Sequence, residues 1–228
     1  MTSLPLPLAQ WRPQDVKQSV WFYPLVGLFV GACLFTVHVL PLPPFLSAVL
    51  VVATWLGITG ALHFDGFCDI ADAAFAAKSP QERQHIVKDP AVGAYALAAA
   101  LILLLLKLSG VMSLEQALYL IVIPILSRSF VLISMTFFKV NQSSVLGRSA
   151  SAGRAKCFGV LGLGTFLSGA IVVGLSPLAY FYLWLTGLSF VLLASYVLVK
   201  RMAGLSGDAY GAIIESSETV MLVVLALG

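Results

Sequence analysis

Long apolar runs alternate with short polar segments along most of this chain. In hydrocarbon every backbone N–H and C=O must be satisfied within its own segment, so apolar runs of about 20 residues predict helices. The runs do not show the period-2 alternation that a membrane β-barrel needs. We therefore expect one integral membrane domain over residues 1–228, an all-α polytopic bundle of about seven transmembrane helices. The expected spans are Val20–Leu40, Phe45–Leu62, Ala91–Leu108, Ala117–Phe138, Phe158–Leu175, Leu178–Val199 and Asp208–Gly228.

Composition and charge agree with this reading. Hydrophobic residues make up 60% of the chain and charged residues 10%, whereas a soluble domain carries about 25% charged residues. A cytoplasmic N-terminus places eleven of the thirteen Lys and Arg residues on the cytoplasmic side. The exceptions are Lys107, expected to snorkel from an outer helix end, and Arg128 inside a span. The net charge of +3 then reports topology, and we expect no nucleic-acid partner.

Polar chemistry is concentrated in residues 61–94, with a cytoplasmic active-site loop at about 63–90. Asp65, Asp69 and Asp72 are spaced i, i+4, i+7, which puts them within an arc of roughly 60° on one helix face. Carboxylates this close repel one another unless they bind a cation or one of them is protonated. Oxygen ligands of this kind suit Mg²⁺ held together with substrate phosphates. The alternative is a solvated acidic helix end, but the neighbouring side chains are too apolar for a freely solvated loop.

Basic side chains follow the carboxylates, as binding of a diphosphate requires. Any one of them alone is more often a topology marker, and the pair Lys88–Asp89 at the entrance to the third span is the most suggestive. His63 lies two residues before Asp65, so on a continuous helix it points away from the carboxylates. It joins the chemistry only if the helix begins near Asp65, and otherwise it is a structural histidine.

Two further features lie later in the chain. Arg128 is near the centre of its span, where a charge costs roughly 3 kcal/mol, so it should face the bundle interior and pair with an acid or a bound anion. Asp208 and Glu215 share a helix face with Gly211 between them, and Glu218 sits at its edge. This stripe indicates a second wall of the same site. Favourable interaction with the helix dipole would explain Asp208 but not the deeper carboxylates.

Four blocks of the sequence are similar to motifs of one enzyme family and come in the same order: YPLVGLFVG, LHFDGFCDIADAAF, IVKDPAVGAYA and GLSGDAYGAIIE. The chain thus resembles the cobalamin synthases, also called adenosylcobinamide-GDP ribazoletransferases, along nearly its whole length. Arg128 falls where such proteins carry an intramembrane arginine. The departures from the family pattern, at Phe64, Ala73–Ala74 and Pro90, remove no charged motif residue.

The resemblance implies a transferase of late cobalamin biosynthesis in the cytoplasmic (inner) membrane of a prokaryote. Such an enzyme moves the cobinamide-phosphate group of adenosylcobinamide-GDP to α-ribazole or its 5′-phosphate, releases GMP, and uses Mg²⁺. The hypothetical roles are Mg²⁺ and diphosphate ligands (Asp65, Asp69, Asp72), one general base (Asp72, Asp89 or His63), phosphate contacts (Lys88, Arg128), and ligands of a second metal or the nucleoside (Asp208, Glu215).

Two rival functions remain. A CDP-alcohol phosphotransferase also uses spaced carboxylates and Mg²⁺, but its Ala-Arg dipeptide is missing after Asp65–Gly66. A cation- or proton-coupled transporter could use the acids and Arg128 as a relay, although the acids cluster on one face instead of crossing the membrane. The expected partners are the lipid bilayer and the two substrates, and the sequence leaves a homo-oligomer open.

Overall fold

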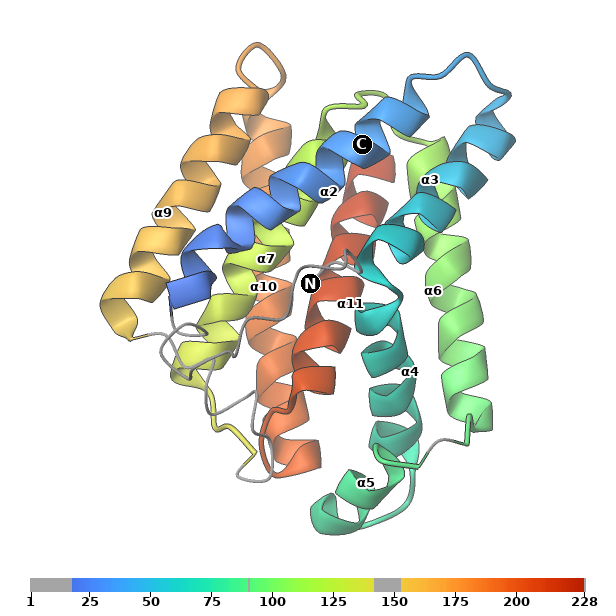
Figure 1. Cartoon of the computed structure of the whole chain (residues 1–228), viewed down its shortest axis with the longest axis vertical. Coiled ribbons are helices and arrows are strands. Elements are labelled where there is room, and N and C mark those ends of the chain that lie inside the picture. The colour runs from blue at the N-terminus through green and yellow to red at the C-terminus, as the bar shows by residue number, and fades with distance from the viewer. Residues whose placement is uncertain (1–17, 90, 142–152, 228) are drawn as a thin grey trace, which may run out of the picture.

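The computed structural model describes residues 18–89, 91–141 and 153–227, which form a bundle of helices (Figure 1). Each apolar run of the sequence forms a helix, as predicted. The helices are η1 (Val20–Phe22), α2 (Tyr23–His38), α3 (Pro44–Thr59), α4 (Leu62–Phe75), α5 (Pro80–Ile86), α6 (Ala94–Met112), α7 (Tyr119–Phe137), α9 (Arg154–Ile171), α10 (Pro177–Met202) and α11 (Gly207–Ala226).

The helices confirm an all-α polytopic membrane bundle. Within the described residues, five segments are long and apolar enough to cross a membrane, and the bent pair α3–α4 makes a sixth if it counts as one span. Those five are Val20–His38, α6, α7, α10 and α11. The predicted fifth span corresponds to α9, which is less apolar because Arg154 and Lys156 lie in its first turn.

Helices α7 and α11 form the centre of the bundle, since 78% and 67% of their apolar windows are buried. Helix α2 crosses α7 at Gly27 and Gly31. A Cβ on Gly27 would collide with the backbone of Pro124 and Ile125, and one on Gly31 would collide with Ile121. The close helix approach predicted from this pair of small residues is therefore confirmed.

A sharp corner separates α3 from α4. Gly60 and Ala61 both have left-handed backbones, with φ of 60° and 55°, and the two helix axes meet at 90°. The Ala61 amide donates to the carbonyl of Leu56 at 2.8 Å, which closes the end of α3. A left-handed backbone is uncommon for alanine, so the surrounding structure must hold Ala61 in this conformation. The corner directs α4 alongside α6 and α11 (Figure 1).

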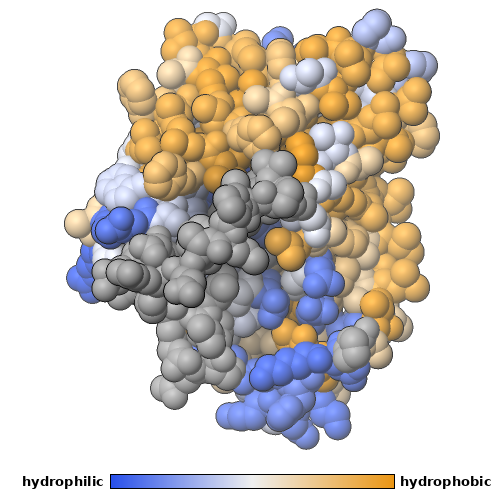
Figure 2. All heavy atoms as spheres, in the orientation of Figure 1, coloured by the Kyte–Doolittle hydropathy of each residue, from blue (hydrophilic) through white to orange (hydrophobic). Residues whose placement is uncertain are grey.

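The polar loops meet at one end of the bundle. Arg83 and Gln84 of α5 donate to the carbonyls of Arg201 and Met202 at 3.3 and 2.9 Å, and the Leu205 amide donates to Lys139 at 2.8 Å. Figure 2 shows hydrophilic residues gathered at this end, below a largely hydrophobic surface. The basic segments around Arg83, Lys139 and Arg201 thus share one end of the molecule, which we call the loop end. Arg12, Lys17 and Arg148, predicted to lie on the same side, are outside the described residues.

Helix α5 is fixed by a capping box at the loop end. The Ser79 side chain accepts from the Glu82 amide, and the Glu82 carboxylate accepts from the Ser79 amide at 2.9 Å. This backbone hydrogen bond lowers the pKa of Glu82.

Candidate active site

The carboxylate face, which we define as Asp65, Asp69 and Asp72, lies on one side of α4. Helix α4 begins at Leu62, so the three side chains sit on continuous helix at the predicted spacing. Asp65 is exposed, whereas Asp69 and Asp72 are half-buried. Apolar residues on other sides of α4 are buried against the bundle, so the helix is held with its acids at the loop end.

Helix α11 packs against α4 with almost no side chain between them. A Cβ on Gly66 would lie 2.8 Å from the carbonyl oxygen of Asp208, and one on Gly211 would lie 3.2 Å from the Cα of His63. This contact brings Asp208 close enough that its negative charge acts on Asp69, together with the charges of Asp65 and Asp72. Asp208 therefore lies beside the carboxylate face, as the hypothesis of a second wall requires.

Asp72 also holds the start of α6. Its Oδ2 accepts from the Gly93 amide at 2.6 Å and its Oδ1 from the Ala96 amide at 2.8 Å. The first amides of a helix have no partner inside it and carry partial positive charge, so a carboxylate there stabilises the helix end. A Cβ on Gly93 would lie 2.6 Å from Asp72 Oδ1, which explains the glycine. No local feature of the sequence indicates this contact.

Lys88 and Asp89 lie in the link between α5 and α6, and both are exposed. Asp89 Oδ1 accepts from the Ala91 amide at 3.0 Å, which shapes the turn before α6. Because Asp72 binds Gly93, the end of this link is attached to the carboxylate face. The predicted contacts of Lys88 and Asp89 with substrate stay predictions.

A second set of charges, the buried charge cluster, joins three helices. It consists of Lys107 on α6, Arg128 on α7, and Glu215 and Glu218 on α11, all at most 1% exposed. Lys107 Nζ pairs with Glu215 Oε1 and lies 3.6 Å from Glu218 Oε2. Arg128 Nη1 donates to Glu218 Oε1 at 2.6 Å. The inward-facing, acid-paired Arg128 predicted from the sequence is confirmed.

Lys107 corrects one expectation. The prediction that it snorkels from a helix end was wrong, because α6 continues to Met112 and the side chain is fully buried. Its Nζ also lies 4.3 Å from the centre of the Trp55 ring, a cation–π contact. A lysine within an apolar run was the available signal, but its partner is 108 residues away.

The acidic stripe of α11 divides between the two regions. Glu215 lies two turns, about 10 Å, beyond Asp208 along the helix, and it pairs with Lys107 instead of facing the loop end. His63 is buried, and the charges of Arg128 and Lys107 act on it. Because α4 begins before His63, helical spacing directs it away from the carboxylate face. The predicted ligand roles of Glu215, Arg128 and His63 stay predictions.

The carboxylates at the loop end have the donor chemistry for a hard cation. Within the described ranges, Asp65, Asp69 and Asp208 form no ion pair. In the same part of the chain, no three His, Cys, Asp or Glu side chains are grouped so as to hold a metal ion. Mg²⁺ is usually bound through one or two carboxylates, with waters and substrate phosphates as its other ligands. Unpaired carboxylates on facing helices fit that mode of binding.

Comparison with known proteins gives matches over nearly the full length. Residues 1–226 match the model of the cobalamin-5-phosphate synthase family. Three proteins named adenosylcobinamide-GDP ribazoletransferase are 34% identical (Brevibacillus brevis, 98% of this chain and 93% of the relative), 35% identical (Stutzerimonas stutzeri, 100% and 94%) and 36% identical (Deinococcus radiodurans, 97% and 81%). No solved structure matches the chain.

Proposed function

Because the chain belongs to the cobalamin-5-phosphate synthase family, we propose that it is an adenosylcobinamide-GDP ribazoletransferase of cobalamin biosynthesis. In this reaction the hydroxyl of α-ribazole, or of its 5′-phosphate, forms a bond to the phosphorus that carries cobinamide. The bond from that phosphorus to the GMP oxygen breaks, and GMP leaves with the electron pair. The hydroxyl proton passes to a base.

The proposed site lies where three carboxylates of two helices meet. Asp65 and Asp69 on α4 and Asp208 on α11 come together at the loop end without a cationic partner among the described residues. Both helices belong to blocks that resemble family motifs. We propose that one or two of these three carboxylates would hold Mg²⁺ together with water and the substrate diphosphate. The ion would neutralise charge on the diphosphate and make the GMP oxygen a better leaving group.

Other side chains have narrower roles in the proposal. Lys88 is exposed in the adjoining link and would offset phosphate charge. Of the three candidate bases, Asp89 is exposed and uses only one oxygen to bind Ala91. Asp72 already accepts an amide on each oxygen, and His63 is buried. We therefore assign the base to Asp89, and we assign Asp72 to positioning the link that carries Lys88 and Asp89.

The test uses the full chain purified in detergent with adenosylcobinamide-GDP and α-ribazole. We expect cobalamin and GMP in equal amounts, loss of turnover after chelation by EDTA, and recovery with added Mg²⁺. Asp69→Asn should lower turnover by at least about a hundredfold while the protein still folds. The matched control is Glu115→Gln, a carboxylate exposed between α6 and α7.

Two results would contradict the proposal. Substantial Mg²⁺-dependent turnover by Asp69→Asn would remove the carboxylate face from the chemistry. A wild-type protein that makes no cobalamin, but transfers a CDP-alcohol group or moves a solute across liposomes, would support one of the rival functions.

A further inference from the structure

An apolar groove runs along the side of α4 that faces away from the carboxylates. It consists of two neighbouring cavities of about 450 and 400 Å³ that share Phe67, Phe75, Ala99 and Ser216. At about 100° per residue, the α4 groove residues Phe67 and Ala74 lie roughly 160° to 180° around the helix from Asp65. Phe75 lies nearer, roughly 60° around the helix from Asp72, so the groove is mostly on the opposite side of α4 and adjoins the carboxylate face only at Phe75.

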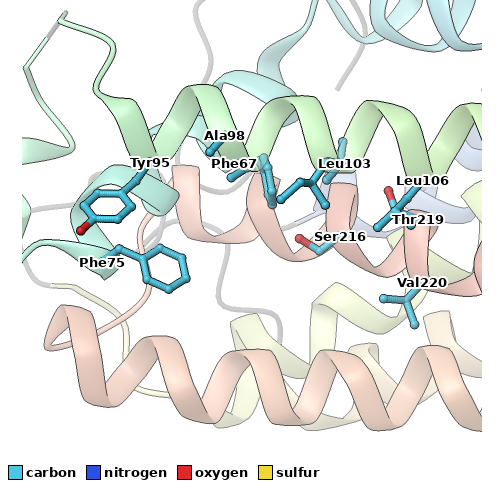
Figure 3. Close-up of a pocket in the computed structure, with 11 residues that line it drawn as sticks. Phe67, Phe75, Tyr95, Ala98, Leu103, Leu106, Ser216, Thr219 and Val220 are labelled. Carbon is cyan, nitrogen blue, oxygen red and sulfur yellow. The ribbon is translucent and has the colours of Figure 1, made fainter.

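The first cavity lies between α4, α6 and α11, and the second between α4, α10 and α11. Figure 3 shows the first, with Leu103 and Leu106 of α6 opposite Thr219 and Val220 of α11. Helix α6 flanks the first cavity and α10 the second, and they are only 28% and 22% buried over their apolar windows, so both face the surrounding hydrocarbon. An apolar groove between helices that face hydrocarbon suits an acyl chain.

The loop end of the groove has a different character. Arg201 lines the second cavity there and is exposed. Its Nη1 donates to the carbonyl of Ala74 at 2.8 Å, which holds the guanidinium at the end of α4. A guanidinium has five N–H donors, so this bond leaves donors for a phosphate. The rings of Phe75 and Tyr95 stack at 5.6 Å beside the same opening, as aromatic residues do at a membrane interface.

We propose that this groove binds an anionic glycerophospholipid of the bilayer. One acyl chain lies between α6 and α10, and the phosphate binds Arg201 at the loop end. The apolar lining of the two cavities suits the acyl chain, and the positive charge of Arg201 at the opening suits the anionic headgroup. The lipid then packs against the groove side of α4, and the carboxylate face lies on the other side of the same helix.

The first test compares two headgroups on the delipidated full chain in detergent. Phosphatidylglycerol and phosphatidylcholine with identical acyl chains are titrated, and native mass spectrometry counts the retained lipid. Phosphatidylglycerol should bind at least about tenfold more tightly. Its phosphate can form a charge-assisted hydrogen bond with Arg201, whereas in phosphatidylcholine the cationic choline competes with Arg201 for the phosphate. Arg201→Gln should remove this preference. Lys200→Gln should keep it, because Lys200 lies over the Tyr196 ring and does not line the groove.

The second test fills the groove and leaves Arg201 in place. Ala99 lines both cavities, so Ala99→Trp should abolish retention of either lipid. The matched control is Gly162→Trp on α9, where nothing lies within 4 Å of the added Cβ. Equal binding of the two headgroups, a preference that survives Arg201→Gln, or lipid retained by folded Ala99→Trp would overturn the proposal. So would a lipid-free dimer that Ala99→Trp dissociates, because a second copy would then fill the groove.

Discussion

Helix α11 carries acids in two settings that differ in how their charge is balanced. Glu215 and Glu218 are buried and meet Lys107 and Arg128 from two other helices. Asp208, two turns earlier, lies beside the carboxylates of α4, accepts a hydrogen bond from Ser206 Oγ at 3.4 Å, and forms no ion pair within the described part of the chain. The protein thus balances the charges it buries and leaves those at the loop end unbalanced. The neutral net charge of the buried charge cluster indicates a structural role. The uncompensated negative charge at the accessible loop end favours a ligand that brings positive charge.

The largest effect is expected from breaking the buried balance. Glu218→Gln leaves Arg128 buried without its carboxylate, which should lower the free energy of unfolding by about 3–5 kcal/mol. Thermal or denaturant unfolding in detergent measures it. Glu115→Gln makes the same chemical change on an exposed carboxylate and should have almost no effect.

The paired change separates charge balance from packing. Arg128→Met with Glu218→Leu removes both charges, so the double variant should unfold less readily than Glu218→Gln. If Glu218→Gln is as stable as Glu115→Gln, the cluster does not have the structural role described above.

A smaller effect should follow from separating the two carboxylate-bearing helices. Gly66→Ala places a Cβ 2.8 Å from the Asp208 backbone, which cannot move aside cheaply, and should cost about 1–3 kcal/mol. It should also lower turnover, because Asp208 moves away from Asp65 and Asp69. Gly57→Ala is the control, since nothing lies within 4 Å of its Cβ and alanine favours helix. Equal turnover in the two variants would show that the close approach does not matter for activity.

The smallest effect on stability should come from Asp72, which differs from Asp65 in binding the start of α6. Asp72→Asn weakens the bonds to Gly93 and Ala96 and should cost about 1.5 kcal/mol, with faster amide exchange at the start of α6. Asp65→Asn should leave exchange there unchanged and lower turnover, because Asp65 is exposed on the same face. Identical exchange profiles would remove the structural role of Asp72.

Much of this arrangement could be predicted from the sequence because it depends on local pattern. The apolar runs located the helices, and the basic residues indicated that the described polar loops share one end. Because a charge inside a span is costly in hydrocarbon, Arg128 was expected to have a buried partner. Helical spacing also placed Asp65, Asp69 and Asp72 on one face. Each of these inferences needs only one segment of the chain.

The remainder depends on contacts between distant segments. Spacing on α11 joined Glu215 to Asp208 as one stripe, but Lys107, 108 residues away, sets the environment of Glu215. Likewise the two amides bound by Asp72 belong to another helix. A helix-face pattern gives the direction of a side chain around an axis, and it does not give the neighbour that it meets there.

The corner at Gly60 and Ala61 has a consequence for how this chain can vary in length. The two left-handed residues fix where α3 stops and α4 starts. Insertion of one residue just after them would rotate every following α4 side chain by about 100°, turning Asp65 and Asp69 toward neighbouring helices. Natural insertions and deletions should therefore accumulate in other connections, while the number of residues from Gly60 to Asp72 stays constant among functional variants.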